Sequence, residues 1–200
     1  EPSHKNSNRE FLKAVDVSAK TSAKRIRNAW SDYETNVDYG IVPMDLPKVA
    51  SCIDAGLETQ LYHVSFRNNA FDTHVQQPNL HRRLLSYASD AIFGFVNDLQ
   101  RLGHGDRVVV MVYSEFGRRV PENANLGTDH GSANNMFFIG NKVNGGHYGV
   151  LPSLLNLIDS GNLAYTTDFR QVYATAIEDW LKVDSTKVLK GSFERLPVFT

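Results

Sequence analysis

Residues 107–131 read Arg-Val-Val-Val-Met-Val-Tyr-Ser-Glu-Phe-Gly-Arg-Arg-Val-Pro-Glu-Asn-Ala-Asn-Leu-Gly-Thr-Asp-His-Gly. The apolar run over residues 108–113 predicts a buried β-strand, and ionisable side chains follow it among glycines and a proline. In open α/β sheets the ligand crevice lies beyond the carboxyl ends of the strands. We therefore expect the chemistry of this protein in the loop that follows the strand.

A second strand and a long helix are predicted just before this stretch. Residues 57–66 are rich in β-forming residues and predict a strand that runs into the polar loop 67–74. Apolar side chains recur at helical spacing over residues 80–102, and Gly103 is placed to end that helix. Strand, helix and strand make a βαβ unit, which implies parallel strands and a right-handed crossover. Both polar loops would then lie at the same edge of the sheet.

These elements predict an α/β fold with a mainly parallel sheet. We expect residues 1–38 to form an N-terminal helical arm and residues 39–200 to form the α/β domain. The other predicted elements are helical character over residues 8–36, a short helix over 45–56, a strand over 135–139, a short helix over 151–158 and an irregular tail over 184–200. A further helix is expected to begin at Asp168, which is a good N-cap and has Gln171 three residues on.

Composition bounds the class of protein. An apolar content of 42% over 200 residues is enough for one sizeable core. A formal charge of -1 with mixed signs argues against nucleic-acid or membrane-surface binding as the main role. The sequence has no stretch of about 18 apolar residues, so we expect no membrane span. Cys52 is the only cysteine, which excludes an internal disulfide and a cysteine-rich metal site.

Two Asp/His pairs follow the two predicted strands. Asp72 and His74 flank Thr73, and Asp129 directly precedes His130. Carboxylate oxygens and imidazole nitrogens that converge at one sheet edge are what a divalent metal needs, so these four side chains are the candidate ligands. The competing interpretation is that each Asp caps a turn and its His hydrogen-bonds to it.

Other polar residues could belong to the same site. Glu115 is either a further metal ligand or the ion-pair partner of Arg118. Asn123, with its neighbour Glu122, reaches the pocket or lies at an exposed loop tip. His147, between glycines and Tyr148, supplies another imidazole or is a surface histidine.

Two hydroxyls lie inside the motif loops, Ser114 and Thr128. Neither has the Gly-x-Ser-x-Gly setting of a nucleophile elbow. Support of the backbone is the expected role of both.

The motifs in these loops resemble, in their order, the bacterial sulfatase-like family called domain of unknown function 1501, which belongs to the alkaline phosphatase superfamily. Residues 168–181 also resemble the C-terminal end of that family, and the resemblance covers about residues 39–197. The motifs are Phe71-Asp72-Thr73-His74, Ser114-Glu115-Phe116-Gly117-Arg118, Glu122-Asn123 and Gly127-Thr128-Asp129-His130-Gly131.

The resemblance implies a mainly parallel sheet with helices on both faces, and divalent ions, zinc among them, at the strand ends. In the superfamily two ions activate a nucleophile and stabilise a phosphoryl or sulfuryl oxygen. Asp72 and His74 match the first ligand pair. The next ligand position matches Asp129-His130, or else Glu115 takes it and His130 takes that of a later histidine. His130 is a ligand in both alignments.

The sequence departs from the superfamily pattern in two ways. Asp72 and His74 are two residues apart, whereas superfamily enzymes commonly place this pair four apart. Family members are about twice this length, and residues 1–50 contain nothing that looks like the family's first strand. The chain therefore resembles the C-terminal half of a longer protein and is expected to hold part of a metal centre.

Three functions follow as hypotheses. The leading one is a metal-dependent hydrolase of phosphate or sulfate esters, or a fragment of one, acting on a small anionic ester. The second is a non-catalytic protein that binds a metal or another ligand at the same loops. The third is an α/β binding module without metal, in which Asp72, His74 and His130 would point apart. By resemblance alone, export from a bacterial cytoplasm, to the periplasm or beyond, is expected.

Overall fold

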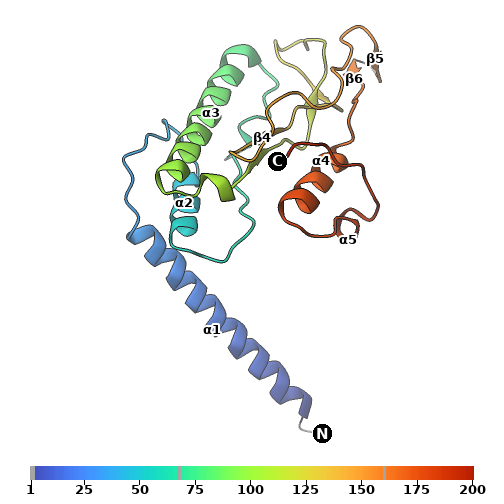
Figure 1. The fold of residues 1–200 in the computed structure, drawn as a ribbon. Coiled ribbons are helices and arrows are strands. Elements are labelled where there is room, and N and C mark those ends of the chain that lie inside the picture. Colours follow the sequence, from blue (N-terminus) through green and yellow to red (C-terminus); the bar gives the residue numbers. More distant parts are fainter. Residues whose placement is uncertain (1–2, 67–68, 160) are drawn as a thin grey trace.

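The computed structural model describes residues 3–66, 69–159 and 161–200 and shows mainly helices joined by long loops (Figure 1). Residues 67 and 68, at the start of the predicted polar loop, lie outside the described residues. The helices are α1 (Ser3–Ser31), α2 (Leu46–Asp54), α3 (Gln77–Arg101), α4 (Phe169–Thr175) and α5 (Thr186–Leu189), with a 3-10 turn η2 (Gly105–Arg107) and a π-helical turn η3 (Ala176–Trp180).

The core lies between α2 and α3, and helical spacing of apolar residues explains it. On α3, Ala91, Phe95 and Leu99 recur every four residues, so they share one face and are at most 3% exposed. Pro47 in the first turn of α2 fits the predicted start of that helix. The predicted helices over 45–56 and 80–102 are thus confirmed. The buried cluster comprises Tyr39, Leu46, Ala50, Ile53, Ala91, Phe95 and Leu99, and Cys52 on α2 is buried as well.

Asp98 is a carboxylate fully buried at the edge of this core. Burial by itself would raise the pKa of Asp98, but hydrogen bonds from Tyr33, Tyr39 and Arg101 outweigh it and hold that pKa below its ordinary value. Tyr39 Oη donates to Asp98 Oδ2 at 2.7 Å, Tyr33 Oη donates to the same oxygen, and Arg101 Nε donates to Oδ1 at 2.8 Å. The two tyrosine bonds fasten the segment before α2 to α3.

The strands are short and pair only as antiparallel couples among the described residues, so the predicted mainly parallel α/β sheet is wrong. In the β1–β4 pair, Met111 lies opposite Phe138. The pairs are β1 (Val110–Val112) with β4 (Phe137–Ile139), β2 (Gly117–Arg118) with β3 (His130–Gly131), and β5 (Leu157–Ile158) with β6 (Asn162–Leu163).

The physical reason for this error lies in two segments. Residues 57–66 run without strand pairing, so no βαβ unit forms around α3. The run over residues 108–113 yields only β1, whose residues are half-buried rather than covered on both faces as in a parallel sheet. An apolar run shows that a segment is buried, but it does not show which segment pairs with it.

Smaller predictions had mixed outcomes. The strand over 135–139 is confirmed in β4, and Asp168 forms the predicted capping box with Gln171. The helix over 151–158 is wrong, because these residues form bends that lead into β5. The tail is more regular than predicted, since it contains α5 and a bridge from Phe199 to Val143.

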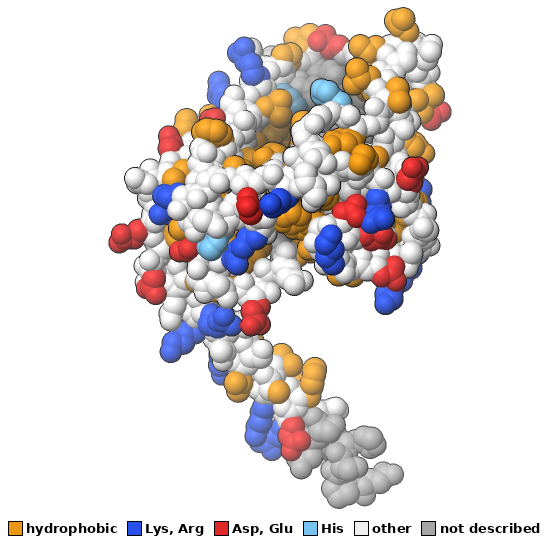
Figure 2. All heavy atoms as spheres, in the orientation of Figure 1, with side chains coloured by type: hydrophobic (Ala, Val, Ile, Leu, Met, Phe, Trp, Pro, Cys, Tyr) orange, Lys and Arg blue, Asp and Glu red, His pale blue; other side chains and the backbone are white. Residues whose placement is uncertain are grey.

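Helix α1 confirms the helical character of residues 8–36 over most of their length and extends away from the rest of the molecule (Figure 1). Its free part carries exposed hydrophobic side chains, with Phe11 67% and Leu12 64% exposed (Figure 2). Ala29, near its C-terminal end, is buried. Of the helices in the described ranges, none combines the length and the apolar character that a membrane crossing requires.

Candidate metal centre

Two loops that are far apart in sequence lie side by side at the N-terminus of α3. The backbone amides of Gln76 and Gln77 donate to the carbonyls of Asn125 and Leu126, each at 2.9 Å. Gly127 makes this contact possible, because a Cβ at that position would lie 2.2 Å from the carbonyl oxygen of His74. The loop that carries Asp72 and His74 is therefore fixed against the loop that leads to His130.

Arg118, on β2, joins the two loops a second time. Its Nη1 donates to the carbonyl oxygen of Thr128 at 2.8 Å, and its Nη2 donates to that of Phe71 at 2.6 Å. Burial lowers the pKa of Arg118, although the charges of Asp72 and Asp129 act in the opposite direction. The rigid guanidinium fork suits such a two-sided contact better than an ammonium would.

A buried polar relay provides a third connection. Gln77 Nε2 donates to Thr73 Oγ1 at 3.0 Å, and Thr128 Oγ1 donates to Gln77 Oε1 at 2.7 Å. Thr73 is only 6% exposed, so it faces inward while its neighbours face outward. The relay thus turns Asp72 and His74 toward the same outer side of the loop.

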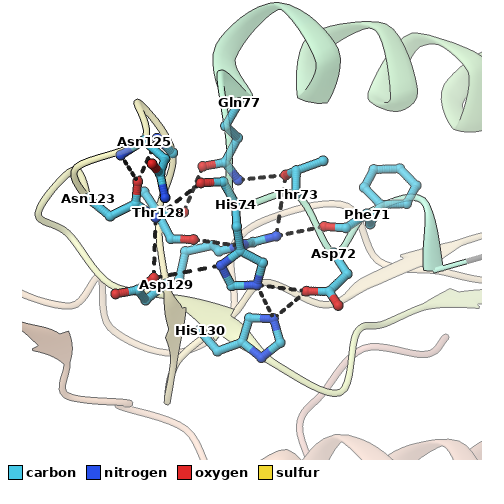
Figure 3. A network of polar contacts seen from close by, with 12 residues as sticks. Phe71, Asp72, Thr73, His74, Gln77, Asn123, Asn125, Thr128, Asp129 and His130 are labelled. Atoms are coloured by element: carbon cyan, nitrogen blue, oxygen red, sulfur yellow. Dashed lines mark hydrogen bonds and ion pairs between the residues drawn. The ribbon is translucent and has the colours of Figure 1, made fainter.

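The result is a cluster of three potential ligand atoms (Figure 3). Asp72 Oδ1 lies 2.7 Å from His130 Nε2 and 2.9 Å from His74 Nε2, and the two Nε2 atoms lie 3.2 Å apart. Zinc–nitrogen bonds of about 2.0 Å in a tetrahedral site place neighbouring ligand atoms about 3.3 Å apart. Two imidazoles and a carboxylate at these separations fit the donor set of a divalent metal ion.

Asp72 is ionised, and the cluster is open to solvent. The His130 imidazole, and after it that of His74, holds the pKa of Asp72 below its ordinary value, so Asp72 is a carboxylate at neutral pH. The three side chains are 39–45% exposed. Figure 2 shows histidine side chains at the surface at the end of the molecule away from the N-terminus of α1. The Phe116 ring stacks on His130, with centroids 3.8 Å apart and planes at 8°.

The structure thus brings together Asp72, His74 and His130 and places the other candidates elsewhere. Asp129 lies behind His74, with its Oδ1 at 3.7 Å from His74 Nδ1. Within the described ranges, Glu115 and His147 are not part of this converging group.

The remaining candidates hold the loops in shape. Asn123 Nδ2 donates to the His74 carbonyl at 3.1 Å and to Asp129 Oδ1 at 3.2 Å. The Arg118 guanidinium bridges the loops by donating to the carbonyls of Thr128 and Phe71, rather than holding Glu115. Ser114 Oγ donates to the Phe116 carbonyl at 3.0 Å, and Thr128 takes part in the buried relay.

Sequence reasoning missed the residues that position the ligands. Thr73 and Gln77 carry no signal beyond polarity, although a residue between two outward-facing neighbours is expected to face inward. Phe116 belongs to one of the motifs, but the motif does not indicate that its ring stacks on His130. The role of Gly127 depends on how closely two distant loops approach, which the sequence pattern does not encode.

Fold and cluster together define a protein of helices and short antiparallel strand pairs that carries a candidate two-histidine, one-carboxylate centre. The chain belongs to the family described as "Protein of unknown function (DUF1501)", whose model matches residues 7–192. No curated protein and no solved structure matches the chain.

Proposed function

We propose that Asp72, His74 and His130 hold a divalent metal ion and that this centre serves the hydrolysis of small phosphate or sulfate esters. The observation that carries the proposal is the convergence of three ligand atoms, two Nε2 and one carboxylate oxygen, within 3.2 Å of one another. The resemblance of the motifs to the alkaline phosphatase superfamily supports the reaction class.

The donor set favours zinc, since two histidines and one carboxylate are the protein ligands of known catalytic zinc sites, although the same set also suits ferrous iron. When bound, a divalent ion supplies Lewis-acid chemistry that favours the hydroxide form of water and offsets charge on a phosphoryl or sulfuryl oxygen. The residues contribute charge and access: Asp72 offsets part of the cation's charge, and the 39–45% exposure of the three side chains leaves a face for a small anionic ester.

A second candidate function is metal binding without catalysis. The hydroxyls of the motif loops are already engaged, Ser114 with the Phe116 carbonyl and Thr128 with Gln77. A hydroxyl that holds its own loop in shape is poorly placed to attack an ester. This observation favours a structural or ligand-binding centre, unless water is the attacking group.

The test is metal content and metal-dependent stability. Protein purified without chelator is analysed for zinc, manganese and iron, and its thermal midpoint is measured after chelation and after addition of each ion. We expect close to one ion per chain and a rise in the midpoint on addition of the preferred ion, because an ion that binds only the folded state stabilises it. His130→Ala should abolish both the bound ion and the rise in the thermal midpoint.

A matched control is His104→Ala, which removes another histidine paired with an aspartate, since His104 Nε2 lies 3.2 Å from Asp54 Oδ1 on the surface. This variant should keep its metal. Wild-type protein that neither contains nor responds to any of the ions would contradict the metal centre. Hydrolysis of p-nitrophenyl phosphate or sulfate by the metal-loaded protein would separate the hydrolase from the non-catalytic alternative.

A further inference from the structure

His74 is the one ligand of the cluster that has a carboxylate on each side. Its Nε2 faces Asp72 Oδ1 at 2.9 Å, and its Nδ1 faces Asp129 Oδ1 at 3.7 Å (Figure 3). The second distance is longer than a direct hydrogen bond, so Asp129 acts on the ring mainly through its charge. It lies on the side of the ring away from the cluster.

The charge of Asp129 matters because it affects where the imidazole protons of the cluster lie. A neutral imidazole carries one N–H, and two Nε2 atoms that lie 3.2 Å apart are poorly placed to carry a proton each. In the metal-free chain, His130 Nε2 is the closer of the two to Asp72, at 2.7 Å, and is the better donor to it. Its proton has to move to Nδ1 or leave before His130 Nε2 can bind an ion. The proton of His74 then belongs on Nδ1, where it faces the negative charge of Asp129.

Asn123 holds Asp129 in that place. Its Nδ2 donates to Asp129 Oδ1 at 3.2 Å and also to the His74 carbonyl at 3.1 Å, so one amide group ties the carboxylate to the histidine it faces. Its Oδ1 accepts from the backbone amides of Asn125 and Gly127, at 2.9 and 3.1 Å, which fixes the amide itself. All five residues belong to loops that are already fastened at the N-terminus of α3.

We infer that Asp129, held by Asn123, is a positioning residue that keeps the proton of His74 on Nδ1 and leaves Nε2 free to bind the ion. The inference rests on the proposed metal centre, and it replaces the sequence-based prediction of Asp129 as a ligand with an action through His74. A carboxylate on the outer nitrogen of a metal-binding histidine fixes the tautomer and raises the basicity of the ligating nitrogen.

The test reads the tautomer and the affinity separately. Nitrogen-15 NMR of the imidazoles in metal-free protein, at pH 8.5 and so above the ordinary histidine pKa of about 6.5, reports which nitrogen of His74 carries the proton. We expect Nδ1–H in the wild type and a shift toward Nε2–H in Asp129→Asn. Zinc affinity, measured by competition with a chelator, should fall by about 10- to 100-fold in this variant.

A second variant protects the test against simple misfolding of the loop. Asn123→Asp keeps the oxygen that accepts from Asn125 and Gly127 but replaces the donor with a carboxylate that repels Asp129. It should change the tautomer and the affinity in the same direction. Asp54→Asn, made at the surface pair with His104, is the matched control and should change neither at His74.

The outcomes separate this inference from the metal centre itself. An unchanged His74 tautomer in Asp129→Asn would overturn the inference even if zinc affinity fell, because the carboxylate would then act as a ligand or attract the cation without setting the tautomer of His74. If the wild type binds no ion, the proposed function fails. The tautomer measured in metal-free protein then decides alone whether Asp129 keeps the proton of His74 on Nδ1. A tautomer shift with a weakened but measurable zinc affinity would support both.

Discussion

The α2–α3 core and the loop cluster at the N-terminus of α3 are built by different means. The core is apolar and periodic, with Phe95 and Leu99 each 3% exposed on one face of a continuous helix. The cluster is polar and irregular, and hydrogen bonds between loops more than 40 residues apart in sequence hold it together. The same helix serves both regions, since its middle supplies the core and its first residue, Gln77, supplies the relay.

The difference shows where stability and function can be separated. Burial of apolar area contributes most of the folding free energy, whereas a hydrogen bond adds only about 0.5–1.5 kcal/mol net. Substitutions in the core should therefore change the stability of the whole chain, and substitutions in the loops should change the ligand geometry with less effect on stability. Three changes, taken from the largest expected effect to the smallest, test that separation.

The largest effect is expected from Phe95→Ala. Removing this buried ring leaves a cavity between α2 and α3, and the free energy of unfolding should fall by about 3–5 kcal/mol. Urea denaturation measures this change. Phe93→Ala, on the same helix at a position that is 68% exposed, is the matched control and should change stability by less than about 0.5 kcal/mol. Zinc affinity should survive in both variants, and its loss in folded Phe95→Ala protein would show that the regions are coupled.

Gly127→Ala should distort the loop cluster at the N-terminus of α3. Its new Cβ would lie 2.2 Å from the His74 carbonyl oxygen, so the two loops must move apart, and zinc affinity should fall by about 100-fold. Competition with a chelator measures the affinity. Gly145→Ala adds the same methyl group where nothing lies within 4 Å and should bind zinc as the wild type does. Equal affinities in the two variants would contradict the close approach of the loops.

The smallest effect concerns the pH dependence of the core edge. The pKa of Asp98 is lower in the folded chain than its ordinary value of about 3.9. Its stabilising contribution is therefore complete above that value and is lost as the pH falls through the lower, folded pKa. Denaturation between pH 6 and pH 2.5 should show a smaller loss of stability in Asp98→Asn than in the wild type. Parallel pH profiles of the two proteins would mean that Tyr33, Tyr39 and Arg101 do not stabilise the charged form of Asp98.

The sequence predicts the core much better than the strand arrangement. A helix such as α3 follows from a periodicity that lies within one segment, as the apolar positions over residues 80–102 show. Strand pairing is a property of two segments, and nothing in residues 57–66 or 108–113 specifies a partner. The apolar run at β1 is typical of a strand in a parallel sheet, whereas its partner is the later segment β4 in the antiparallel direction.

At the candidate site, the motifs predict the ligand residues but not the contacts that bring them together. The expectation that the loop of Asp72 and His74 would meet that of His130 rested on a parallel sheet, yet the loops meet without one. Backbone pairing at Gln76 and the guanidinium of Arg118 bring them together. Motif residues thus identify the chemistry, while the groups that set its geometry are a glycine, a threonine and a glutamine with no distinctive pattern.

The single cysteine provides a probe that lies in one of the two regions. Cys52 is 7% exposed on α2, so a thiol reagent reaches it only when the core side of the molecule opens. Its labelling rate under native conditions would give the free energy of that opening without any engineered label. Adding zinc should leave the rate unchanged if the loops bind the ion without the core, and should slow it if both open as one cooperative unit.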